Sequence, residues 1–456
     1  MLEQNQYPQQ ILSSNIPQRL QNSVFRGVPE YSSMNACVGN NGNPDIYYYA
    51  EGFSVATLTL IDHLLQKDRT QLDILIYPIC FNLRHSVELY LKGFIDELNK
   101  LAKIKKTTLS PPPNTTPKNI LKVHDIGLLW QHLIYNSAKL DPRYAEYVIK
   151  LTPLIECINE VDPTGQTFRY SYDMDTRTKH LIPVAVINII NLREQFCIIQ
   201  DHLESLDRLN QYLIQEYKTN TFTTKLSRQD ICNIAERLPS YSSWAGSNFS
   251  ILKNELKNEY NISNKELCKA LDFIKKTYVL CNKIELNLSP LGLTEETLFS
   301  FITLWNQTND LKKLQDYEKE RIAYEAENGN KPRIVNLTSK EVIAEILNDH
   351  GDEKKAMQEL FTQATPELIA GLYSLTEYSR DLFPETYVQG YETELKSYQI
   401  IYQQGTESWQ NAIENIWCAS FGKMSFPIKI IHSLRRLDMV ILAKRTEDYC
   451  GLTGLV

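Results

Sequence analysis

The sequence predicts an all-α protein, with an N-terminal antiparallel helical bundle followed by a second multi-helix region. Glycine is sparse, with 17 residues in 456, so turn signals are few. In the most regular segment one helical face would carry Ile76, Leu83, Val87, Leu91 and Phe94. Serine and threonine residues that can cap helices precede several later segments with the same periodicity. These observations favour helices joined by short loops over strands.

The expected helices of the bundle fill residues 44–218, after an arm of residues 1–43 that is rich in Gln, Asn, Ser and Pro and is extended or partly ordered. Small residues in the first helix, among them Ala50 and Gly52, would let a neighbouring helix approach closely. The elements predicted in order are a helix at 47–66, the central helix at 77–100, a proline-rich surface loop at 103–122, a helix from 124, a helix at 142–159 interrupted at Pro153, an ordered loop or short hairpin at 165–180, and a long helix from Pro183 to Tyr217.

A linker at 219–224 leads to a C-terminal helical domain of unknown role at 225–456. A charged helix is expected to end at Asn328 and Gly329. Two helices over 248–279 have the outline of a helix-turn-helix, but Glu255 and Glu259 interrupt the basic stripe that DNA reading needs. Helix starts are predicted at Ser227, Ser263, Thr294, Ser339 and Thr365.

The composition excludes several classes of protein. A net charge of −7 gives no general attraction to nucleic acid or anionic lipid, so any RNA contact needs a local basic patch. The nine cysteines form no C-x-x-C pair, so neither a metal site nor a disulfide framework is expected, and no cofactor is implied. The first 21 residues lack the pattern of a signal peptide, and no apolar run is long enough to span a membrane. A cytoplasmic protein is the resulting expectation.

The candidate site begins on the central helix, where Arg84, His85, Glu88 and Lys92 fall on one face. One interpretation is an intrahelical ladder of ion pairs, with Glu88 between Arg84 and Lys92 at i,i+4 spacing. The other is a polar pocket inside the bundle, in which the cations hold phosphate and the histidine moves protons. The sequence favours neither interpretation over the other.

Two further segments supply candidates. His124 would face the central helix and add a second proton carrier, and Asp125 either caps the third helix or contributes to binding. Arg169 and Tyr170 lie in the irregular segment before the long helix, and that loop could bring a guanidinium and a phenol over the pocket. The alternative for this pair is an exposed arginine beside a core tyrosine.

Four motifs in this order resemble the HEPN superfamily of bacterial helical bundles over residues 45–215. They are Y-x-E-G-F from Tyr49, R-H-x-x-E-L-x-L-K from Arg84, H-D-x-x-x-L-W from His124, and F-R-Y from Phe168. The resemblance implies a dimeric domain of toxin–antitoxin and phage-defence systems. Active members are metal-independent ribonucleases in which the RNA 2′-hydroxyl is the nucleophile. Their usual R-x(4)-H signature is absent, because no arginine of this sequence has a histidine five residues later.

The first functional hypothesis is therefore a cytoplasmic bacterial defence or toxin-like protein whose bundle binds or cleaves RNA. Arg84, His85, Glu88, His124 and Arg169 are the catalytic candidates, and Lys92, Asp125 and Tyr170 are the substrate-binding candidates. The alternative is a non-catalytic interaction or regulatory module of a defence or toxin–antitoxin complex. Expected partners are RNA, a protein of the same system and a second copy of the bundle, without a membrane.

Overall fold

A computed structural model describes residues 24–66, 69–113, 119–173, 176–329, 350–378 and 381–456. Within these ranges every regular element is a helix, and β-pairing is limited to one isolated bridge between Tyr172 and Lys179. The predicted all-α class is confirmed for this part of the chain. The chain divides into two compact units, residues 1–210 and 211–456. No described helix has the length and apolar character needed to cross a membrane.

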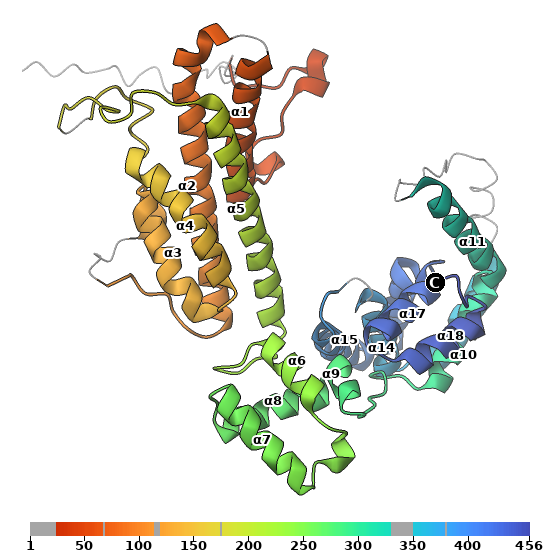
Figure 1. The fold of residues 1–456 in the computed structure, drawn as a ribbon. Coiled ribbons are helices and arrows are strands. Elements are labelled where there is room, and N and C mark those ends of the chain that lie inside the picture. The colour runs from red at the N-terminus through yellow and green to blue at the C-terminus, as the bar shows by residue number, and fades with distance from the viewer. Residues whose placement is uncertain (1–23, 67–68, 114–118, 174–175, 330–349, 379–380) are drawn as a thin grey trace, which may run out of the picture. The chain divides into compact units, whose positions relative to one another are not determined.

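The N-terminal unit is built from long helices that run along one another (Figure 1). The helix α2 is central, because it packs against both α1 and α3, and α4 packs against α3. Arg193 Nε of α5 donates to Asp62 Oδ1 of α1 at 2.8 Å. The helices are α1 (Ile46–Gln66), α2 (Leu72–Ile104), α3 (Ile126–Leu140), α4 (Tyr144–Val161) and α5 (Ile189–Lys218), the last of which continues past residue 210.

Proline interrupts neither of the helices that contain it. Pro153 lies inside α4 and Pro78 inside α2, although the sequence predicted a break at Pro153. A helical proline frees the carbonyl four residues earlier. These carbonyls belong to Ile149 and Ile74, residues that are 74% and 70% exposed.

The long helix starts later than predicted. It was expected from Pro183, but α5 begins at Ile189. Asn188 provides the cap, since its Oδ1 accepts hydrogen bonds from the backbone N–H groups of Ile190 and Asn191, both at 3.0 Å. Residues 183–188 instead form part of a non-helical wall at this end of the bundle.

The two segments predicted to lie outside the helical units differ from each other. Residues 24–43 hold two short 3₁₀ turns and no buried residue. Residues 219–224, expected as a linker, are packed into the C-terminal unit: Thr219, Thr221 and Thr223 are buried, and Gln389 donates to the Thr219 carbonyl at 3.1 Å.

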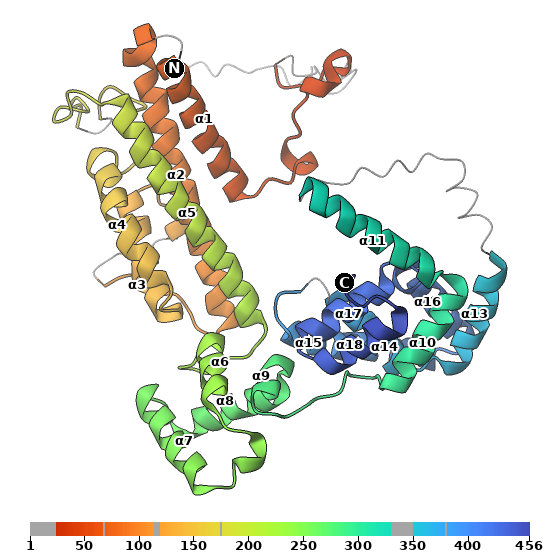
Figure 2. The ribbon, with the colours of Figure 1, turned by 45° about the vertical axis from the view of Figure 1, so that its right-hand side comes forward.

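The C-terminal unit has its own apolar core, in which α14 packs against α15 and α17 (Figure 2). A smaller cluster gathers around α6 and α8. The helices are α6 (Arg228–Arg237), α7 (Ser247–Glu259), α8 (Asn264–Lys276), α9 (Tyr278–Lys283), α10 (Glu295–Thr308), α11 (Leu311–Asn328), α13 (His350–Gln363), α14 (Pro366–Tyr378), α15 (Glu385–Gln403), α16 (Thr406–Ile416), α17 (Phe426–Arg436) and α18 (Val440–Cys450).

Predicted caps start four of these helices. Ser227 and Thr294 form capping boxes, the Ser263 side chain accepts from the Glu266 N–H, and Thr365 accepts from the Leu368 N–H at 3.2 Å. The start predicted at Ser339 lies outside the described residues. Capping depends on neighbours in the sequence, which is why these starts could be predicted without tertiary information.

The close crossing of α14 by the segment before α10 gives a stability prediction. A methyl group on Gly371 would lie 2.5 Å from the Leu291 carbonyl oxygen, so Gly371→Ala should lower the free energy of unfolding by about 1–3 kcal/mol. Gly390 of α15 is the matched control, since its nearest neighbour would be 3.9 Å away; Gly390→Ala should raise stability by about 0.5–1 kcal/mol. Denaturant unfolding of the full chain measures both, and equal effects would contradict the proposed steric cause.

Candidate functional site

The side chains of Arg84 and Glu88 lie inside the bundle. Each residue is only 2% exposed, although the sequence placed both on the polar face of α2. Two ionised groups are costly to bury unless their hydrogen-bonding capacity is satisfied. The site is therefore built around the way in which this pair is satisfied.

Arg84 ties α2 to two other segments of the chain. Its Nη1 donates to Glu88, its Nε to the Asp162 carbonyl at 3.2 Å, and its Nη2 to the carbonyls of His124 and Pro163. The Pro163 carbonyl also accepts from the Ile126 N–H at 3.0 Å. The guanidinium thus fixes the start of α3 and the end of α4 against the middle of α2.

The loop after α4 is shaped to receive this guanidinium. Gly165 has a φ of +80°, and a Cβ there would lie 3.1 Å from Arg84 Nη1. The turn is held by Asp162, whose Oδ1 accepts from the N–H groups of Gly165 at 2.8 Å and Thr167 at 3.2 Å. Only glycine combines this backbone conformation with so close an approach.

The Glu88 carboxylate contacts four basic side chains. Its Oε1 contacts Lys92 Nζ and His124 Nδ1, both at 2.8 Å, while Oε2 contacts Arg84 and lies 3.9 Å from His85 Nδ1. Burial alone would raise the pKa of Glu88, but the polar contacts with His85 and Lys92 and the positive charges of Arg84 and Lys92 outweigh it and hold the pKa well below the usual range. The carboxylate is therefore ionised at neutral pH.

The side chains of His85 and His124 are more exposed than those of Arg84 and Glu88. The side chain of His85 is 30% exposed and that of His124 is 69% exposed. The His85 ring stacks on Phe81 at a centroid distance of 5.6 Å and meets the edge of Phe53 at 4.5 Å. Aromatic packing thus orients His85, whereas the Glu88 carboxylate orients His124.

The loop residues Arg169 and Tyr170 reach the same surface. The Arg169 guanidinium carbon lies 5.6 Å from the centre of the Phe81 ring and 5.2 Å from that of Tyr170, and Nη2 donates to the Tyr170 hydroxyl at 3.3 Å. Contacts therefore run from Tyr170 through Arg169 and Phe81 to His85. The structure brings the five catalytic candidates into one connected group.

The remaining candidates have contacts of a different kind. The Asp125 carboxylate caps α3 by accepting from the Leu128 N–H at 2.9 Å. The Lys92 side chain is 12% exposed and lies beside Glu88.

Sequence reasoning missed Phe53, Phe81 and Gly165. Phe53 and Phe81 lie on the two helices that carry the motifs, at positions close to the residues that the sequence singled out. Gly165 lies in a segment that the sequence identified only as a loop.

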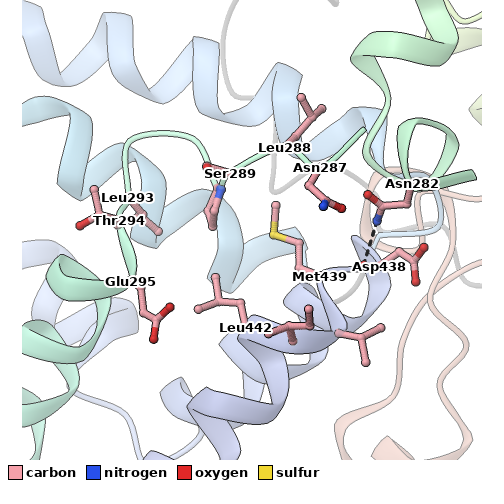
Figure 3. Close-up of a pocket in the computed structure, with 13 residues that line it drawn as sticks. Asn282, Asn287, Leu288, Ser289, Leu293, Thr294, Glu295, Asp438, Met439 and Leu442 are labelled. Carbon is pink, nitrogen blue, oxygen red and sulfur yellow. Dashed lines mark hydrogen bonds between the residues drawn. The ribbon is translucent and has the colours of Figure 1, made fainter. Parts of the chain in front are cut away.

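Two cavities differ in the ligands that they suit. One, of about 660 Å³, is next to the candidate site and includes Arg169, Tyr170 and Lys179 in its lining. The other, of about 630 Å³, lies in the C-terminal unit, with the carboxylates of Glu295 and Asp438 beside apolar residues such as Met439 and Leu442 (Figure 3). The described residues that line the second cavity include no cationic side chain, so this lining does not suit a phosphate. Among the described residues no group of histidine, cysteine and carboxylate side chains could hold a metal ion.

Comparison with known proteins returns no counterpart, because no family model, no curated protein and no solved structure matches this chain. The function must therefore be inferred from the geometry of the site itself.

The low pKa of Glu88 gives a prediction about acid stability. Below about pH 4.5 the unfolded chain takes up a proton on this group before the folded chain does, so stability should fall as the pH falls. Glu88→Gln should lower stability at pH 7 by roughly 3 kcal/mol, because Arg84 loses its counter-charge, and should flatten the dependence below pH 4.5.

Glu156→Gln, at an exposed position of α4, is the matched control and should leave both quantities nearly unchanged. Urea unfolding between pH 3 and 7 measures them. An unaltered acid dependence in Glu88→Gln would contradict the prediction.

Proposed function

We propose that the N-terminal bundle binds RNA and cleaves it without a metal ion, through attack of a ribose 2′-hydroxyl on the adjacent phosphate. The observation that carries the proposal is the pair of accessible imidazoles, His85 and His124, placed on opposite oxygens of one buried carboxylate. Imidazole is the side chain that ordinarily exchanges protons near neutral pH, so two such groups can serve as base and acid.

The reaction needs one proton removed and one supplied. One histidine takes the proton of the 2′-hydroxyl while the 2′-oxygen forms a bond to phosphorus. The other histidine gives a proton to the 5′-oxygen while the bond between the 5′-oxygen and phosphorus breaks. The products are a 2′,3′-cyclic phosphate and a 5′-hydroxyl. Glu88, ionised and fixed by Arg84 and Lys92, orients the imidazole of His124 and stabilises the charge of a protonated ring.

Phosphate binding falls to the more accessible cations. Arg169 is exposed, and Lys92 is partly accessible beside the histidines. Arg84 is enclosed and donates from each of its three guanidinium nitrogens, so its role in the proposal is positioning. The Tyr170 ring, 41% exposed, offers a surface on which a base can stack.

A second candidate function is a non-catalytic interaction module, and the enclosure of Arg84 and Glu88 favours it. A buried network that joins α2, α3 and the loop after α4 can fix the geometry of the bundle without any substrate. In either case the resemblance described above points to a bacterial defence or toxin-like setting, with a protein partner or a second copy of the bundle.

The test of cleavage uses the purified full chain with EDTA, a single-stranded RNA and a DNA of the same sequence. The wild type should cut only the RNA, since DNA has no 2′-hydroxyl. His85→Asn and His124→Asn should each lower the rate at least about 100-fold, because each removes an acid or base. His63→Asn, at an exposed position of α1, is the matched control and should retain the full rate.

Melting temperatures measured in parallel separate chemistry from folding. Full RNA cleavage by both site variants, or equal cleavage of the DNA, would overturn the ribonuclease proposal. A wild type that is fully folded by its melting temperature and cuts no RNA would support the interaction module.

A further inference from the structure

The cavity next to the candidate site is lined by the first turns of α2 and by the loop that precedes α5. It has a volume of about 660 Å³, within the roughly 300–1,000 Å³ of small-molecule sites. The loop wall is ordered by backbone hydrogen bonds, from the His180 N–H to the Ser171 carbonyl at 3.1 Å and from the Asp173 N–H to the Thr178 carbonyl at 2.8 Å.

The lining combines three kinds of chemistry. Arg169 and Lys179 are exposed cations, Tyr77 and Tyr170 are rings that are about half exposed, and aliphatic residues such as Ile76 complete the wall. Asp73 is the single carboxylate among the described residues that line the cavity. The Nε2 atom of His180 is buried and has no hydrogen-bond partner in the described structure.

We propose that this cavity is a nucleotide subsite, in which an aromatic base enters between the tyrosines and the aliphatic wall and its phosphate binds Arg169 and Lys179. A flat ring with a polar edge and an attached phosphate matches this lining, since tyrosine rings stack on bases and cations bind phosphate oxygens. The Asp73 carboxylate can accept a hydrogen bond from an amino group of the base. A purely apolar ligand would leave both cations unused.

The inference rests on the proposed function, because it assigns the subsite to a nucleotide beside the bond that is cut. Arg169 connects the two places: it lines the cavity and also lies over Phe81, the ring that stacks on His85. The same chemistry would bind a free mononucleotide, so the experiment compares the two sources.

The test measures binding to the full chain by calorimetry, with adenosine monophosphate, adenosine and inorganic phosphate as separate probes, and by fluorescence anisotropy with a single-stranded RNA oligonucleotide. The mononucleotide should bind at least tenfold more tightly than adenosine or phosphate alone. Tighter binding of the oligonucleotide than of the mononucleotide would identify the RNA chain as the source, and the reverse order would identify a free nucleotide.

Two variants test the location. Ala185→Trp fills the cavity from an exposed position in its wall, and Lys179→Glu reverses one of its charges; each should weaken binding of the mononucleotide at least tenfold. Ala138→Trp on α3 and Lys103→Glu at the other end of α2 are matched controls at exposed positions, and they should bind as the wild type does.

The outcomes separate this inference from the proposed function. Nucleotide binding that depends on the cavity, in a protein that cuts no RNA, would retain the subsite and remove the ribonuclease. RNA cleavage at the full rate by Ala185→Trp, with unchanged binding of the mononucleotide and of the oligonucleotide, would retain the ribonuclease and overturn the subsite. Absence of binding by every nucleotide probe, or binding unchanged in both cavity variants, would also overturn it.

Discussion

The N-terminal unit depends on the contacts of one buried guanidinium. Arg84 donates to Glu88 and to three backbone carbonyls that come from the start of α3 and the end of α4. A buried charge is tolerated only when its donors are satisfied, so these carbonyls must stay where they are. Gly165 makes this possible, because its backbone turns in the left-handed region directly against the arginine.

This constraint divides the ionisable groups into two classes. Arg84 and Glu88 are enclosed and form the framework, whereas His85, His124 and Arg169 are at least partly accessible. Accessible groups can bind a ligand or exchange protons, and enclosed groups can only hold them in place. The same arrangement can therefore serve catalysis or assembly. In catalysis the accessible groups contact RNA, and in assembly they contact a protein partner.

Local signals located many of the helices. Capping residues such as Ser227 and Thr294 marked helix starts, since a cap involves residues only three apart. The predicted start of α5 at Pro183 was wrong, although proline is common in the first turn of a helix. The helix begins at Ile189 instead, because the Asn188 side chain caps it. The continuity of α4 through Pro153 was not predicted, because a proline within a helical pattern usually ends or kinks the helix.

For the candidate site, the sequence determined which residues share a face of α2, because helical spacing alone places Arg84, His85, Glu88 and Lys92 together. Only the tertiary structure decided which of them are buried. Burial depends on segments distant in the chain, here the α3 start and the turn at Gly165, whose carbonyls satisfy the guanidinium. Helical periodicity records neighbours within one helix; it carries no information about the carbonyls that another segment brings to that helix.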